Sequence, residues 1–122
     1  MILRVKHVSI PVTDQDRALE FYTQKLGFEV KTDVSFGEGQ RWIKLSIPKA
    51  ETEVILFTLE GHENRIGTMQ NIVFASADVR KDYTELKEKG VEFLGEPADE
   101  SWGTYVMFKD TEGNQFILSS AD

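Results

Sequence analysis

The chain contains no cysteine at any of its 122 positions. Disulfide bonds, thiolate zinc sites and a cysteine nucleophile are therefore excluded, and the absence agrees with a reducing compartment. The opening stretch MILRVKHVSI does not have the long apolar region and small-residue cleavage site of a signal peptide. No apolar run approaches the length of a membrane span. We therefore predict a cytoplasmic protein that does not bind a membrane.

Positive charge is also scarce, because 14 lysines and arginines stand against 21 acidic residues and give a net charge of −7. No run of lysine or arginine forms a basic stripe, so nucleic acid and anionic membranes are unfavourable partners. Hydrophobic residues make up 40% of the chain and charged residues 29%, which is typical of a globular protein. A chain of this length can bury a sizeable core within one domain.

The most informative pattern is an internal repeat. HVSIPVTDQDRALEFYTQKLGFEV, from His7, has the same order of features as NIVFASADVRKDYTELKEKGVEFL, from Asn71. Each segment predicts a short strand, an aspartate that caps an amphipathic helix, a glycine that ends the helix, and a second strand. Two further strands follow in each half, at roughly 40–47 and 52–59 in the first and roughly 103–109 and 114–119 in the second.

We therefore predict an α+β fold in which residues 1–122 form a single domain of two tandem βαβββ modules, about 1–60 and about 66–122. The curled mixed sheets are expected to surround a cavity, with the helices on the outer face. The polar stretch EGHENRIGT, residues 60–68, is expected to connect the modules. It contains His62, which is expected to be a solvated loop residue.

Strand alternation sorts the side chains of each predicted sheet onto two faces. One face is uniformly apolar and is expected to pack on the helices, whereas the other mixes polar and aromatic residues. This mixed face either lines a ligand cavity or is a half-exposed sheet surface. It is predicted to carry His7, Trp42, Lys44 and Leu56 in the first module and Asn71, Tyr105, Met107 and Ile117 in the second, with Trp102 beside it.

The tandem repeat, with the pieces HVSIPVTD, ALEFYTQKLGFEV and FKDTEGNQFIL, resembles the vicinal oxygen chelate superfamily. Its members include glyoxalase I, extradiol dioxygenases, and bleomycin- and fosfomycin-resistance proteins. The resemblance implies that two modules, often from two subunits, close around a cavity, and hence a homodimer. In metal-using members it also implies a divalent ion held by the first and last strands of each module. The segments align these ligand positions with His7, Leu56, Asn71 and Ile117.

Only one of those four positions holds a strong ligand. His7 is competent, but Leu56 and Ile117 have no lone pair and Asn71 offers a neutral amide oxygen. Because a tight divalent site needs three or four good ligands, no cofactor is expected, and a divalent metal is the less favoured alternative. Glu53 would join the mixed face only if the fourth strand were shifted by an odd number of residues, which would also turn Ile55 and Phe57 toward the cavity.

The sequence therefore predicts a glyoxalase/bleomycin-resistance-like protein with a degenerate metal site, which binds a small organic molecule in a mixed aromatic and polar cavity. Trp42, Trp102 and Tyr105 could stack on a planar or cationic ligand, and Lys44 or Lys109 could attract an anionic group. Residues 36–40 and 96–103 are candidate rims of this cavity.

An enzyme is the alternative hypothesis: a glyoxalase-like lyase, isomerase or dioxygenase with an unusual metal shell, or a metal-free acid–base enzyme. His7 is the candidate catalytic residue, because an imidazole can take and give a proton near neutral pH. A third hypothesis is an accessory module without a ligand of consequence.

Overall fold

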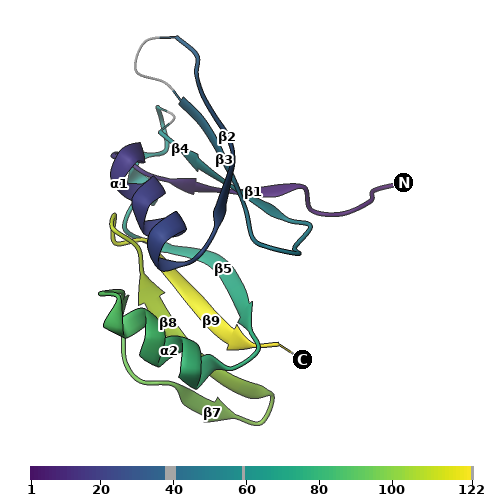
Figure 1. Ribbon diagram of the computed structural model, residues 1–122, viewed down its shortest axis with the longest axis vertical. Helices are drawn as coiled ribbons and strands as arrows, with labels where there is room; N and C mark the ends of the chain where they lie inside the picture. Colours follow the sequence, from purple (N-terminus) through teal and green to yellow (C-terminus); the bar gives the residue numbers. More distant parts are fainter. Residues whose placement is uncertain (38–40, 59, 122) are drawn as a thin grey trace. The chain divides into compact units, whose positions relative to one another are not determined.

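A computed structural model describes residues 1–37, 41–58 and 60–121 of the chain. The chain divides into two compact units, Met1–Ile66 and Gly67–Asp122, and each contains one sheet (Figure 1). The prediction of an α+β fold built from βαβββ modules is confirmed. Of the two candidate rims, residues 38–40 of the first lie outside the described residues.

The first unit holds a four-stranded mixed sheet with the strand order β1-β4-β3-β2. Strand β1 runs parallel to β4, and the other neighbours are antiparallel. A single π-helical turn, Phe21–Lys25, continues α1. The elements are β1 (His7–Pro11), α1 (Gln15–Glu20), β2 (Glu29–Ser35), β3 (Arg41–Ser46) and β4 (Glu53–Phe57), followed by a short 3-10 turn at Glu63–Arg65.

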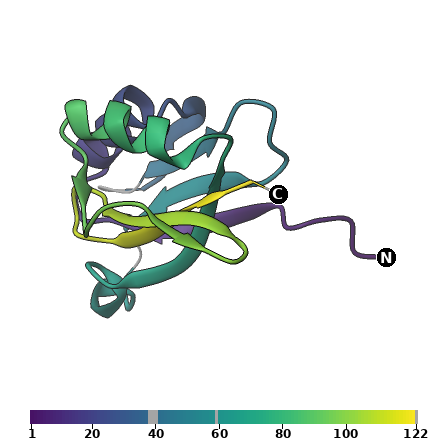
Figure 2. The same ribbon diagram turned by 90° about the horizontal axis from the view of Figure 1, so that it is seen from below.

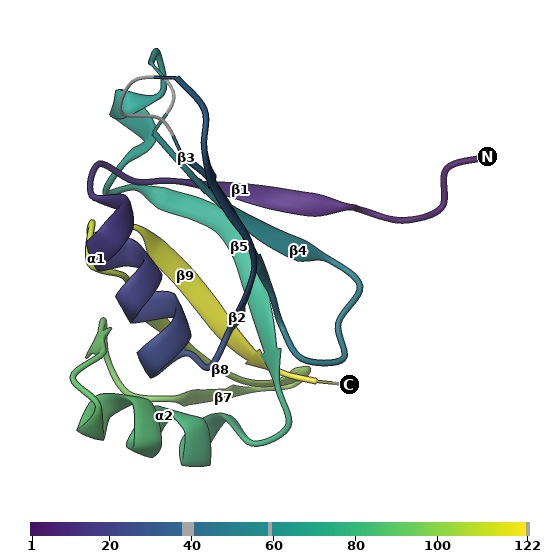
Figure 3. The same cartoon turned by 45° about the horizontal axis from the view of Figure 1, so that its top comes forward.

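The second unit repeats this order with one addition. Its sheet has the order β5-β9-β8-β6, and β9 lies parallel to and beside β5 (Figure 3). The addition is β7, which pairs with β8, so the rim expected at residues 96–103 contains a strand. Helix α2 covers one face of the sheet, against β8 and β9 (Figure 2). The elements are β5 (Met69–Ser76), α2 (Val79–Glu88), β6 (Glu92–Phe93), β7 (Ala98–Glu100), β8 (Gly103–Lys109) and β9 (Gln115–Ser120).

Both helices begin as the sequence predicted. An Asp14 carboxylate oxygen accepts a hydrogen bond from the Arg17 amide at 3.0 Å, and Asp78 accepts one from the Lys81 amide at 3.1 Å. These bonds satisfy amides that have no partner within the helix. Gly27 follows the first helix with a φ of 80°, a left-handed conformation in which glycine carries little strain. Within the described ranges, no helix is long and apolar enough to cross a membrane.

Each unit buries an apolar layer between its sheet and its helix. The first core contains Ala18, Tyr22, Ile10, Ile43, Leu45, Val54 and Leu56, and the second contains Val79, Val106, Phe108, Phe116 and Leu118. In the second core the rings of Phe108 and Phe116 lie 5.5 Å apart between centroids. These residues alternate along their strands, so the residues between them lie on the opposite face of each sheet.

A buried polar cluster closes the turn between β8 and β9. The Asn114 side chain is fully buried, and its Oδ1 accepts hydrogen bonds from the Gly67 amide at 2.8 Å and from Gln70 Nε2 at 3.1 Å. Its Nδ2 donates to Asp110 Oδ2 at 3.0 Å, while Asp110 Oδ1 accepts from the amides of Glu112 and Asn114. One side chain therefore joins the start of β5 to the β8–β9 turn, and its polar atoms are satisfied as burial requires.

Candidate functional site

The mixed face of the first sheet brings together residues from three strands. The parallel register pairs His7 with Glu53 and Ser9 with Ile55, and the antiparallel register pairs Ile55 with Lys44. Directly paired residues have their side chains on the same face of a sheet. His7, Glu53 and Lys44 therefore share one face, together with Trp42, which is two residues from Lys44 on β3.

The placement of Leu56 on this face was wrong. Leu56 pairs with Ile10 and Ile43, is 0% exposed, and lies on the face that packs against the helix. The faces of β4 are therefore the reverse of those predicted. Glu53, Ile55 and Phe57 lie on the mixed face, and Glu53 lies beside His7. Alternation could not reveal the face because Val54, Ile55, Leu56 and Phe57 are all buried and apolar.

His7 sits beside an aromatic wall. Its ring meets Trp42 edge-on, with centroids 6.1 Å apart and an angle of 78° between the planes. Its Nδ1 is buried and has no hydrogen-bond partner among the described residues. A buried imidazole nitrogen without a partner is costly, so this nitrogen retains hydrogen-bonding capacity that the chain does not use. Trp42 itself is 36% exposed.

Glu53 is held by two ammonium groups. Lys31 Nζ lies 2.9 Å from Glu53 Oε2, and Lys44 Nζ lies 4.0 Å from Oε1. The close contact with the Lys31 ammonium group lowers the pKa of Glu53 below its ordinary value; burial opposes this effect, and the charges of Lys31, Lys44 and Lys6 add to it. Sequence reasoning missed Lys31 because β2 has a register irregularity between Val30 and Thr32, which hides the face of the residue in between.

This arrangement disfavours a divalent ion at His7. His7 and Glu53 are two potential ligands, but two ammonium groups already surround the carboxylate and would repel a dication. No group of three or more histidine, aspartate or glutamate side chains with the geometry of a metal site occurs within the part of the chain that the structure describes.

The lowered pKa of Glu53 predicts that the folded protein loses stability in acid. Because its folded pKa is lowered, its contribution is complete above the unfolded value near 4.3 and is lost as the pH falls through the folded pKa. The difference in free energy of unfolding between wild type and Glu53→Gln should therefore be largest near pH 7 and shrink below about pH 4. Urea denaturation at a series of pH values measures it, with the exposed Glu51→Gln as the charge-matched control. A difference that stays constant with pH would contradict the ion pair.

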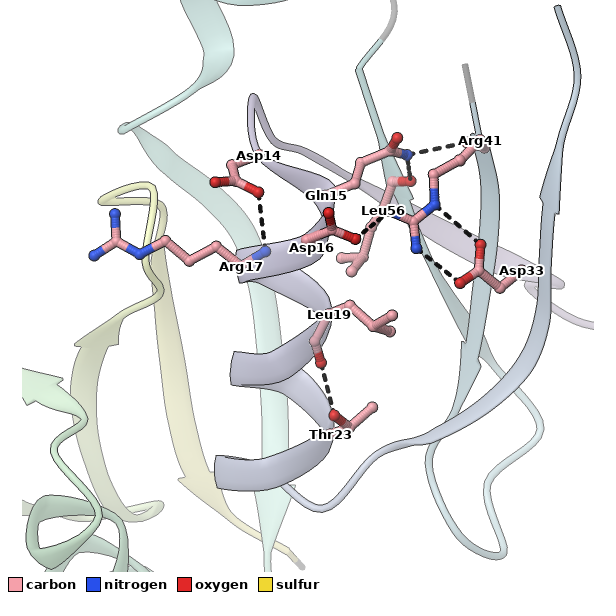
Figure 4. A network of polar contacts seen from close by, with 9 residues as sticks. All are labelled: Asp14, Gln15, Asp16, Arg17, Leu19, Thr23, Asp33, Arg41 and Leu56. Carbon is pink, nitrogen blue, oxygen red and sulfur yellow. Dashed lines mark hydrogen bonds and ion pairs between the residues drawn. The ribbon is translucent and has the colours of Figure 1, made fainter. Parts of the chain in front are cut away.

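A polar network behind this face fixes the start of β3 (Figure 4). Gln15, at the start of α1, is buried and donates through Nε2 to the carbonyl oxygens of Arg41 at 3.0 Å and Leu56 at 3.1 Å. The Arg41 guanidinium binds Asp33 through two nitrogens, at 3.1 and 2.8 Å, and also contacts Asp16. Its hydrogen bond lowers the pKa of Asp33. The network therefore ties α1, β2, β3 and β4 together immediately before Trp42.

The second unit carries the predicted aromatic residues on its own mixed face. The register pairs Tyr105 with Ser119, and Met107 with Ile117, which in turn pairs with Val73. The prediction that Tyr105, Met107 and Ile117 share a face is therefore confirmed. A hollow of about 140 Å³ opens at the edge of β8. It is lined by Leu94, Gly95, Glu96, Ala98, Tyr105, Val106 and Met107.

Trp102 stacks on Tyr105, which lines this hollow. It occupies the two-residue turn between β7 and β8 and stacks on Tyr105, with ring centroids 5.6 Å apart and planes 30° apart. The indole is nevertheless 59% exposed. The turn ends at Gly103, where a Cβ atom would lie 2.2 Å from Ser120 Oγ, so only glycine fits. We call Trp102 and Tyr105 the aromatic shelf.

Asn71 and His62 differ from their expected positions. Asn71 is exposed and has a φ of 59°, at the register irregularity between Met69 and Val73, so it lies outside the regular ladder. Asparagine tolerates this left-handed conformation better than most residues. His62 is not simply a solvated loop residue, because it is half-buried and its ring meets Phe57 edge-on at 5.4 Å.

Comparison with known proteins identifies the family. The model of the Glyoxalase/Bleomycin resistance protein/Dioxygenase superfamily matches residues 4–118. The chain therefore belongs to this superfamily, and the resemblance derived from its motifs is confirmed.

Three similar proteins show the range of the likeness. YetH of Bacillus subtilis (strain 168) is 36% identical over 118 residues, which cover 97% of this chain and 98% of YetH. The crystal structure of a superfamily member from Sphaerobacter thermophilus DSM 20745 has a TM-score of 0.89 at 32% identity, covering 98% of each chain. TnmS3, described as an antibiotic binding protein from Streptomyces sp. CB03234, has a TM-score of 0.88 at 30% identity, covering 99% of this chain and 98% of TnmS3.

Proposed function

We propose that this protein binds a small organic molecule with a flat aromatic group, and that it needs no metal ion to do so. The observation that carries the proposal is the aromatic shelf, in which Trp102 is 59% exposed and stacked on Tyr105, a residue that also lines the hollow. A ring pair held in this way is ordered before the ligand arrives, so binding loses little side-chain entropy.

The energetics of the shelf favour a planar ligand. Covering about 100 Å² of apolar surface at about 25 cal/mol per Å² would contribute roughly 2.5 kcal/mol, and ring stacking adds about 0.5–1.5 kcal/mol. Met107 and Leu94 extend the apolar surface along the hollow. The description of TnmS3 as an antibiotic binding protein supports the same class of function.

The metal-free part of the proposal rests on donor chemistry. His7 and Glu53 alone would be an incomplete shell, and Lys31 and Lys44 already neutralise the carboxylate. In the second unit Asn71 offers a neutral amide and Ile117 offers no donor. The family's metal-dependent chemistry would therefore lack its ligands here. A homodimer in the cytoplasm, as the family resemblance and the composition led us to predict, remains part of the proposal.

The test uses the two tryptophans of the chain as separate reporters. In the Trp42→Phe variant, after treatment with a chelator, the fluorescence of Trp102 should change saturably with 2-naphthol or flavone but not with cyclohexanol. The melting temperature should rise with the same compounds. Trp102→Ala, followed by the melting temperature, should weaken binding by roughly tenfold or more.

Two results would contradict the proposal. One is the absence of any saturable change with the flat compounds. The other is binding that appears only after nickel, zinc or manganese is added and is lost in His7→Ala. The second result would favour a metal-dependent lyase or dioxygenase.

A second candidate function, acid–base catalysis, is favoured by the register that places Glu53 beside His7. A neighbouring carboxylate can orient an imidazole for proton transfer. Turnover of a bound compound that disappears in His7→Ala, without loss of binding, would distinguish catalysis from binding alone.

A further inference from the structure

The mixed face of the first unit carries a positive cluster within an acidic protein. Lys31 and Lys44 flank the single carboxylate of Glu53, so this group of three has a net charge of +1, whereas the whole chain has −7. Lys6 adds a further positive charge close enough to lower the pKa of Glu53. Glu29 also belongs to this face, at its far edge, where it is exposed and paired with Ser46.

Within this cluster, the ammonium group of Lys44 has the most unused capacity for hydrogen bonds and ion pairs. Its side chain is only 24% exposed, yet its nearest acidic partner is 4.0 Å away, beyond hydrogen-bonding distance. No hydrogen bond from its ammonium group is present among the described residues. A half-buried ammonium has lost part of its hydration, so a second anion that replaced the lost water would be bound more strongly than at a free surface.

The surroundings of Lys44 define the shape of that anion. The register places Lys44 in one row with Ile55 and Ser9, and the rings of His7 and Trp42 meet on the same face. Ile55 is only 1% exposed, so the residue next to Lys44 in this row is apolar and inaccessible to solvent. Trp42 lies two positions from Lys44 on the same face of β3, so its indole is a neighbour of any anion bound at Lys44, which favours an aromatic ring that carries the charge.

We infer that the Lys44 face binds the carboxylate of an aromatic acid, with its oxygens near the Lys44 and Lys31 ammonium groups and its ring against Trp42. This site belongs to the first unit and the aromatic shelf belongs to the second, so the inference adds a second binding site to the proposed function. The Glu53 carboxylate positions the ammonium groups of Lys31 and Lys44. The ligand carboxylate accepts hydrogen bonds from the N–H groups that do not point at Glu53. No metal ion takes part.

A matched pair of probes tests the charge. 2-Naphthoate and 2-naphthamide have the same ring system, but only the first is an anion. In the Trp102→Phe variant, which leaves Trp42 as the reporter, naphthoate should bind roughly tenfold or more tightly than naphthamide. This preference should decrease as the salt concentration rises, because added ions screen the lysines.

Three variants locate the effect. Lys44→Gln should abolish most of the preference for naphthoate, Lys44→Arg should keep it, and Lys81→Gln, an exposed lysine on α2, should leave it unchanged. Circular dichroism confirms that each variant is folded, and Lys31→Gln provides a second test on the same face.

The outcomes separate this inference from the proposed function. Equal binding of the two compounds, or a preference that survives in both Lys44→Gln and Lys31→Gln, would overturn the inference and leave small-molecule binding intact. Failure of naphthoate, naphthamide and the neutral flat compounds to bind would overturn both.

Discussion

Replacing Asn114 with alanine is expected to lower the free energy of unfolding by about 2–4 kcal/mol, because the change removes several buried hydrogen bonds at once. The Gly67 amide and Gln70 would lose their acceptor, and Asp110 would lose one of its donors. The fully buried position leaves little water to replace them. Urea denaturation followed by circular dichroism measures the loss.

The control for this change is Asn64→Ala, which deletes the same group from an exposed residue of the 3-10 turn. It should alter the free energy of unfolding by no more than about 0.5 kcal/mol. If the two variants were equally stable, the Asn114 cluster would not hold the β8–β9 turn in the way that its hydrogen bonds indicate.

The second large effect is expected at Gln15. Its Nε2 donates to two carbonyl oxygens, so Gln15→Glu would place a carboxylate against two acceptors in a buried position. The loss at neutral pH should be about 3 kcal/mol or more, since an ionised group is buried without donors. An acid in the first turn of α1 interacts favourably with the helix dipole, but this offsets only a few tenths of a kcal/mol of the loss.

The penalty at Gln15→Glu should depend on pH in a defined direction. Burial beside carbonyl dipoles raises the pKa of the introduced carboxyl in the folded state, so protonation is easier in the folded than in the unfolded protein. As the pH falls through that raised pKa, the variant should regain stability relative to wild type. The control is Gln24→Glu, the same change at an exposed position. A deficit that does not shrink between pH 7 and pH 4 would contradict this orientation of the amide.

The fold could be predicted from local signals that occur twice. Asp14 and Asp78 each precede a helix that they cap, and Gly27 and Gly90 each follow one with a positive φ. These helix-capping signals depend on a few neighbouring residues, so they can be recognised without knowledge of the tertiary structure. The short strand β7 escaped prediction because ADE is not a strand-forming sequence, and its pairing with β8 comes from the hairpin turn instead.

The candidate site was only partly predictable. Tyr105, Met107 and Ile117 were placed correctly because β8 and β9 alternate buried and half-buried residues. Leu56 was misplaced because β4 is buried on both faces. Its sequence is apolar throughout and does not indicate which residues face the helix and which lie on the mixed face. The partners of Glu53 come from β2 and β3, and such contacts depend on register that a single sequence does not encode locally.

The position of Trp102 has a consequence for how this protein could change over time. The shelf residue stands at the tip of a two-residue hairpin turn, outside the buried layer of Phe108 and Phe116. Under the proposed function, substitutions at Ser101 and Trp102 would alter the range of ligands at little cost to folding, provided that Gly103 is retained beside Ser120. Selection for a new compound can act on the hairpin tip while the framework that holds it stays the same.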